Sequence, residues 1–93
     1  IVHHPNVHLL YKNNKKIELT ILENRILLYF SKHIGQVVTR EELMLQVWGY
    51  QADVNTRTLD MHIVRLRKKI ETDPEQPLYL QTVRGVGYKF LVN

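Results

Sequence analysis

The chain has 93 residues, and 13 Lys and Arg against 9 Asp and Glu give it a formal net charge of +4 and a pI of about 9.5. It contains no cysteine, which excludes a disulfide scaffold, a thiolate zinc site and a cysteine nucleophile. Its longest apolar run, residues 26–30, is far shorter than the ~20 residues of a membrane-spanning helix. We expect residues 1–93 to form one small folded domain and, because the first residue is not Met, to be a fragment of a longer protein.

Alternating apolar and polar residues predict strands in the N-terminal segment, residues 1–19. The strands at residues 7–12 and 15–19 flank the asparagine pair 13–14, which tolerates the positive φ of a tight turn. A short earlier strand is expected around residues 1–3.

The middle of the chain, residues 20–71, is predicted to form three helices. Thr-x-x-Glu capping boxes at residues 20–23 and 39–42 predict the starts of the first two. The first helix is expected to run to about residue 33, with Gly35 as its left-handed C-cap and the following valine pair as a short apolar link. A glycine also closes the second helix, after Trp48.

The third and longest predicted helix runs from a cap at Asn55 or Thr56 to about Glu71. On a helical wheel, four apolar residues form one buried stripe, and the opposite face is basic but includes the apolar Met61 and Val64. In a DNA major groove, such side chains contact thymine methyl groups while Arg binds guanine, whereas a merely solvated helix has little use for them. The stripe is formed by Leu59, Ile63, Leu66 and Ile70, and the opposite face by Arg57, Thr58, Met61, Val64, Arg65 and Lys68.

The basic face has a simpler explanation in part, because cations in the last turn of a helix oppose its dipole favourably. That explanation accounts for Lys68 and Lys69. It does not account for Arg57, which lies in the first turn, where positive charge is unfavourable. We therefore favour nucleic-acid contact over a solvated basic face.

The C-terminal segment, residues 78–93, is predicted to be a hairpin with strands at residues 80–83 and 88–92. Arg84 stands at its turn beside glycines, which permit a positive φ and close backbone approach. An Arg held at such a tip can enter a narrow, electronegative minor groove. Alone, an ordinary hairpin with an exposed Arg is the simpler interpretation, but after a basic helix we favour DNA contact.

Four segments together closely resemble the OmpR/PhoB-type winged-helix domain, the C-terminal output domain of many bacterial two-component response regulators. No segment is specific alone, but the combination is, and it covers nearly the whole chain. The resemblance implies an α+β fold, a winged helix-turn-helix with an N-terminal antiparallel sheet, three helices and a C-terminal β-hairpin, the wing. The segments are residues 37–43, 47–50, 57–70 and 82–90.

The resemblance also implies roles for individual residues. Val64 differs from family members that carry Arg at this position, so the DNA sequence that the domain recognises stays open. Bases would be contacted by Arg65, Val64, Met61, Thr58 and Asp60, the last alternatively orienting an arginine, and the minor groove by Arg84. The DNA backbone would be contacted by Trp48, Arg57, His62, Arg67, Thr82 and Tyr88, of which Trp48 and Tyr88 fit a core position equally well. A loop formed by Tyr50, Gln51, Ala52, Asp53 and Val54 would contact RNA polymerase.

The same resemblance implies a cytoplasmic transcription regulator with a preceding phosphoacceptor receiver domain, bound to tandem DNA half-sites as a head-to-tail homodimer. A membrane-anchored regulator with the same domain is a variant of this hypothesis. A different class of function is a protein-interaction module without DNA affinity, with Met61 and Val64 at the interface. Salt-sensitive binding to random duplex DNA distinguishes the two classes.

Enzymatic chemistry finds no support in the sequence, which shows no paired carboxylates, catalytic triad or metal-ligand set. His3, His4 and His8 would point in different directions along a strand, and we expect them to be solvated. His62 has no accompanying nucleophile. We therefore expect no enzyme, no metal site and no cofactor.

Overall fold

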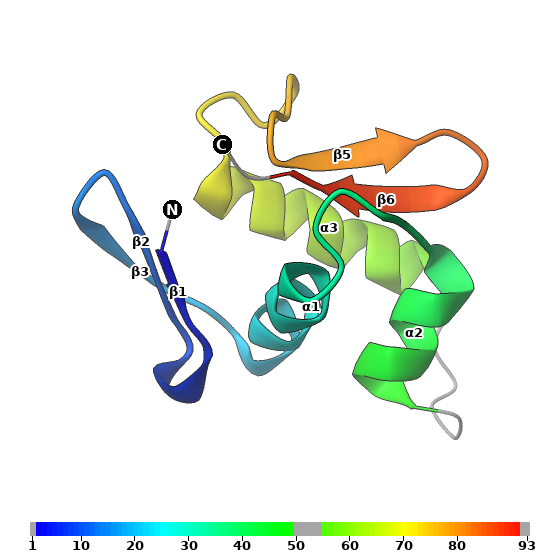
Figure 1. Ribbon diagram of the computed structural model, residues 1–93, viewed down its shortest axis with the longest axis horizontal. Helices are drawn as coiled ribbons and strands as arrows, with labels where there is room; N and C mark the ends of the chain where they lie inside the picture. The colour runs from blue at the N-terminus through cyan, green and yellow to red at the C-terminus, as the bar shows by residue number, and fades with distance from the viewer. Residues whose placement is uncertain (1, 50–54, 92–93) are drawn as a thin grey trace.

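The computed structural model describes residues 2–49 and 55–91 and arranges them as two small sheets and three helices (Figure 1). In chain order the elements are β1 (Val2–His4), the 3₁₀ helix η1 (Pro5–Val7), β2 (Leu9–Lys12), β3 (Lys15–Glu18), α1 (Ile21–Ser31), β4 (Val37–Thr39), α2 (Arg40–Trp48), α3 (Thr56–Ile70), β5 (Leu80–Val83) and β6 (Gly87–Phe90). This is the predicted winged helix, with β5 and β6 as the wing. None of the described helices is both long and apolar enough to cross a membrane.

The N-terminal sheet has the predicted antiparallel order β1-β2-β3. Asn13 and Asn14 have φ values of 52° and 64°, as the tight turn between β2 and β3 requires. The strand expected from residue 7 begins only at Leu9, because Pro5–Val7 form a 3₁₀ turn that ends in a left-handed His8 with φ 54°. Leu10 points from this sheet into the core and is fully buried.

The capping box at the start of α1 is confirmed: Glu23 N donates to Thr20 Oγ1 at 3.2 Å, and Thr20 N donates to Glu23 Oε1 at 2.9 Å. The helix ends at Ser31, earlier than expected, with Lys32 as its C-cap. Gly35 has the expected positive φ of 79°, but its N–H donates to Phe90 O at 2.9 Å. Gly35 therefore belongs to the turn that leads toward β4 and is not the cap of α1.

The valine pair after Gly35 is not merely a link, and that expectation was wrong. Val37–Thr39 form β4, which pairs antiparallel with β6 and gives the second sheet the order β4-β6-β5. Gly87 makes this pairing possible, because a Cβ atom there would lie 2.1 Å from Val38 O.

The second capping box is only half formed. Glu42 N donates to Thr39 Oγ1 at 3.1 Å and begins α2 as expected. The carboxylate of Glu42 does not return to the backbone of Thr39 and instead accepts a hydrogen bond from the hydroxyl of Tyr29. This bond joins α1 to α2, and Gly49 closes α2 as expected, with φ 91°.

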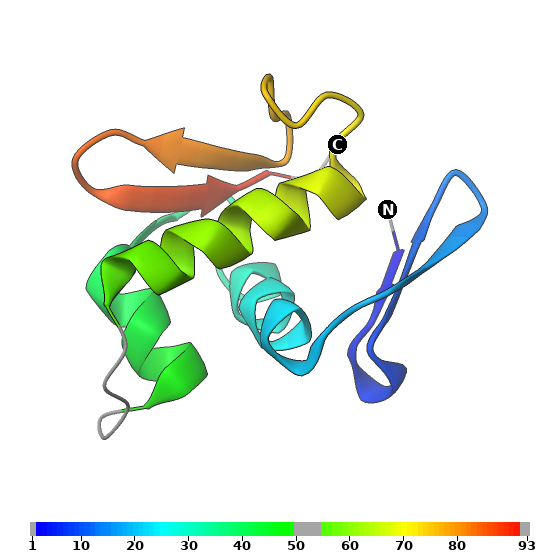
Figure 2. The same ribbon diagram turned by 180° about the vertical axis from the view of Figure 1, so that it is seen from behind.

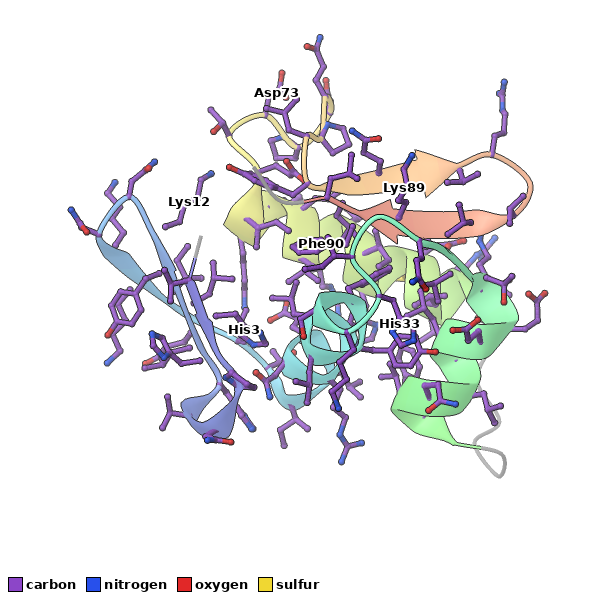
Figure 3. All side chains as sticks on the ribbon, viewed as in Figure 1. His3, Lys12, His33, Asp73, Lys89 and Phe90 are labelled. Carbon is purple, nitrogen blue, oxygen red and sulfur yellow. The ribbon has the colours of Figure 1, made fainter. Side chains whose placement is uncertain are left out.

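The third helix packs against α1 and α2, and the wing runs alongside it (Figure 2). Asn55 caps α3 by accepting from Thr58 N at 3.1 Å, and the four predicted stripe residues are fully buried. The side chain of Phe90, the last residue of β6, points toward α1 (Figure 3), with its ring centroid 6.0 Å from that of Phe30. The helix exit is fixed by the buried Glu71, whose carboxylate accepts from the backbone N–H groups of residues 78–80 at 2.8 to 3.2 Å. The base of the wing is therefore held against the C-terminal end of α3.

Candidate nucleic-acid interface

The face of α3 opposite the buried stripe is exposed, as the wheel predicts. In Figure 2, α3 is the nearest element to the viewer and no other ribbon crosses it. Met61 and Val64 are each 49% exposed, and both line a shallow hollow of about 340 Å³. The hollow is lined by Arg57, Asp60, Met61, Val64, Arg65 and Lys68. One hollow thus gathers four of the five predicted base-contact residues.

This face is electrostatically positive. Within residues 2–49 and 55–91 the ion pairs are Arg40–Asp60 and Lys69–Glu23, so none of the three cations lining the hollow is neutralised by a described carboxylate. Lys69 lies off the face, because its Nζ donates to Glu23 Oε1 at 2.6 Å and to Glu18 O at 2.9 Å. The hollow therefore combines apolar side chains with positive charge that no carboxylate of residues 2–49 and 55–91 neutralises.

Asp60 is the one acid of α3 and the most constrained of the predicted base-contact residues. Its Oδ1 accepts from Arg40 Nε at 3.1 Å and from the Tyr88 hydroxyl at 2.5 Å. Of the two roles considered for Asp60, orienting an arginine is thus present in the structure. The hydrogen bond from Arg40 to Asp60 is the main cause that raises the pKa of Arg40 above its usual value.

Arg40 was not singled out by the sequence analysis, although one signal was available. It is the first residue of α2, where a cation opposes the helix dipole unfavourably. Such a position calls for a nearby anion, and Asp60 provides it.

Tyr88 is a core residue, which is one of the two interpretations that the sequence left open. Its side chain is only 4% exposed, and burial together with the hydrogen bond to Asp60 raises the pKa of Tyr88 to about 12. The guanidinium carbons of Arg40 and Arg67 lie 5.3 Å and 5.6 Å from its ring centroid, within cation–π range. In this DNA-free structure its hydroxyl donates to Asp60 Oδ1.

The rings of Trp48 in α2 and His62 in α3 pack against each other. Their ring centroids are 5.3 Å apart in an edge-to-face arrangement, and both side chains are partly exposed. His62 Nδ1 lies 2.8 Å from Thr58 O, and because a carbonyl only accepts, Nδ1 must donate. The His62 Nε2 atom is then the ring nitrogen left for an outside partner.

Arg67 and Thr82, two predicted backbone-contact residues, are brought together by a direct hydrogen bond, Nη2 to Oγ1 at 2.8 Å. Arg84 is exposed at the wing tip, where Gly85 has φ 77° and Val86 N donates to Val83 O at 3.0 Å. The tip lies toward the N-terminal end of α3 (Figure 1). The wing tip and the N-terminal end of α3 therefore lie at the same end of the molecule.

The remaining expectations concern residues 50–54 and the N-terminal histidines. The loop expected to contact RNA polymerase, residues 50–54, lies outside the described residues. His3 Nε2 is 2.7 Å from Asn24 Oδ1, and His4 packs edge-to-face on Tyr11. In the described parts of the chain no three His, Asp or Glu side chains gather as a metal-binding group.

Comparison with known proteins gives consistent matches. Residues 14–90 match the family described as "Transcriptional regulatory protein, C terminal". The DNA-binding domain of E. coli CadC is 30% identical with a TM-score of 0.84, covering 96% of this chain and 83% of that one. The Klebsiella pneumoniae RstA DNA-binding domain, solved in complex with the RstA box, is 28% identical with a TM-score of 0.82, covering 95% and 87%. Thermotoga maritima DrrB, an OmpR/PhoB homolog, is 42% identical with a TM-score of 0.78, and the match covers 85% of this chain and 36% of DrrB.

Proposed function

This chain belongs to the C-terminal domains of transcriptional regulatory proteins, the OmpR/PhoB-type DNA-binding output domains of response regulators, and we propose that it recognises a specific duplex sequence through the exposed face of α3. The observation that supports this most is the hollow on α3, where two half-exposed apolar side chains lie among cations that form no ion pair with any carboxylate in the described part of the chain. A major groove presents both thymine methyl groups and guanine acceptors to such a surface.

Arg65 is the proposed guanine-contacting residue. It is exposed at the hollow, and the forked donors of its guanidinium match guanine O6 and N7. Met61, Val64 and Thr58 then contact apolar base edges. Arg57 binds a phosphate, which gives a reason for a cation in the first turn of α3.

The wing contributes the second set of contacts. Arg84 enters the minor groove beside the α3 site, where a narrow groove concentrates negative potential. Trp48, His62, Arg67 and Thr82 contact the sugar-phosphate backbone and fix the register of α3. His62 can donate to a phosphate only through a protonated Nε2, since its Nδ1 donates to Thr58 O.

We also propose that the protein binds tandem half-sites as a homodimer, which membership of this family supports. Sedimentation of the protein bound to duplexes with one or two half-sites tests this proposal.

Contact with RNA polymerase through residues 50–54 is supported by the resemblance of the flanking segments alone. Loss of transcription activation without loss of DNA binding in variants of this loop would support it.

The test of base recognition uses a duplex selected by this protein from a random DNA pool. Arg65→Ala is expected to weaken binding to the selected duplex by about 1–3 kcal/mol and to relax the sequence preference. Arg25→Ala, which removes an exposed arginine of α1, is the matched control and should leave binding unchanged. Equal losses by Arg65→Ala on selected and random duplexes would show that Arg65 does not recognise bases.

A further inference from the structure

The side chain of Asp60 joins the DNA-facing side of α3 to two other elements. One oxygen, Oδ1, accepts from Arg40 at the start of α2 and from Tyr88 in β6 of the wing. Asp60 also lines the α3 hollow. This carboxylate therefore lies where the helix face and the wing meet.

Arg67 extends the connection along the wing. Its guanidinium faces the ring of Tyr88, and it donates to Leu80 O at 2.9 Å and to Thr82 Oγ1 at 2.8 Å. Thr82 is in turn the cross-strand partner of Tyr88. The resulting group, the positioning cluster, consists of Arg40, Asp60, Arg67, Thr82 and Tyr88.

The Arg40–Asp60 pair is poorly placed to serve stability alone. The two side chains are 26% and 41% exposed, and ion pairs with such exposure contribute little because water screens them. Arg40 also opposes the dipole of α2. Together with the hydrogen bond from Tyr88 to Asp60, the pair provides a fixed geometry between α2, α3 and the wing.

We propose that Asp60 and Tyr88 are positioning residues that set the wing relative to α3, so that Arg84 meets the minor groove when α3 occupies the major groove. The inference rests on the proposed function. A rigid connection raises the effective concentration of the second contact once the first is made. A loosely held wing would have to be ordered during binding, which weakens its contribution.

The experiment measures binding of the selected duplex by four proteins: the wild type, Arg84→Ala, Tyr88→Phe and the double variant. In the wild-type background Arg84→Ala should weaken binding about tenfold. In the Tyr88→Phe background it should weaken binding less than about threefold, because a loosened wing no longer delivers Arg84. Asp60→Asn, which removes the charge and retains the size of the side chain, repeats the test if Tyr88→Phe does not fold.

Tyr29→Phe is the matched control, because it also removes a tyrosine hydroxyl that donates to a carboxylate, but between α1 and α2. In its background, Arg84→Ala should still cost about tenfold. A second readout is the set of NMR order parameters of the backbone amides of residues 84–87 in the free protein. These order parameters should fall in Tyr88→Phe and stay unchanged in Tyr29→Phe.

The positioning role is wrong if Arg84→Ala costs the same in the Tyr88→Phe and wild-type backgrounds, or if the wing amides keep their order. In that case the loss caused by Arg65→Ala still stands as evidence for base recognition. If Arg84→Ala has no effect in the wild type, the minor-groove contact is wrong, and so is the purpose assigned to the cluster. If Arg65→Ala has no effect either, the proposed function itself fails.

Discussion

Arg67 Nη2 donates a hydrogen bond to Thr82 Oγ1 at 2.8 Å, so two residues expected to contact the DNA backbone are hydrogen-bonded to each other in the free protein. The Nε atom of Arg67 also donates to Leu80 O at 2.9 Å. The α3 helix and the wing are therefore assembled before DNA binds, and less conformational freedom has to be lost on binding.

Replacing Arg67 with alanine removes both of these hydrogen bonds. We expect the free energy of unfolding to fall by about 1–3 kcal/mol, measured by urea denaturation. Binding to selected and random duplexes should weaken by the same factor, because phosphate contacts carry no sequence information. A larger loss on the selected duplex would place Arg67 among the base-contacting residues.

The Lys69–Glu23 pair predicts a pH dependence of stability. Burial raises the pKa of Glu23, but the hydrogen bond from Lys69 and those with Thr20 outweigh burial, so its pKa lies below the usual 4.5. A carboxyl with a lowered folded-state pKa stabilises the fold above its unfolded-state pKa, and this stabilisation is lost as the pH falls through the folded-state value. Glu23→Gln should therefore reduce the free energy of unfolding at neutral pH, and the difference from wild type should shrink below pH 4.5.

Chemical denaturation at a series of pH values checks this expectation. Glu75→Gln, at an exposed acid in the loop after α3, is the control and should differ little from wild type at every pH. A Glu23→Gln difference that stays constant down to low pH would contradict the role given to the Lys69–Glu23 pair.

Gly87 is required by packing, and Gly85 by backbone conformation. A Cβ on residue 87 would lie 2.1 Å from Val38 O and 2.8 Å from Thr39 Cα, so Gly87→Ala must separate β4 from β6. We expect a loss of more than about 2 kcal/mol in thermal or urea unfolding. Gly85→Ala should cost only about 1 kcal/mol, because Gly85 has φ 77° but open space around it. A smaller loss for Gly87→Ala than for Gly85→Ala would contradict the close approach of β4 and β6.

Salt dependence tests the electrostatic part of the interface. If about five phosphates are neutralised, log K should fall with log[salt] with a slope of about −4.5. Arg57→Ala should reduce the magnitude of the slope by about 0.9, whereas Arg25→Ala should leave it unchanged. A slope near zero for the wild type would favour the alternative of a protein-interaction module.

The sequence predicted those features that depend on neighbouring residues. The buried stripe of α3 follows from a 3.6-residue period, and the caps at Thr20 and Asn55 follow from short-range hydrogen bonding. The turn at Asn13 and Asn14 follows from the tolerance of these side chains for positive φ.

Features that depend on contacts between distant segments were missed. β4 is only Val37–Thr39, too short to show a period, and its pairing partner β6 lies near the far end of the chain. Glu42 has the spacing of a capping box, but the sequence does not reveal that Tyr29 competes for its carboxylate. The link from Arg40 through Asp60 to Tyr88 likewise joins three elements that only the fold brings together.

An NMR titration of the protein with the selected duplex tests whether α3 and the wing tip form the DNA-binding surface. We expect the largest shifts of backbone amide and arginine side-chain signals along residues 57–68 and at residues 84–86. Large shifts confined to the N-terminal sheet or to α1, with α3 and the wing tip unchanged, would contradict this expectation.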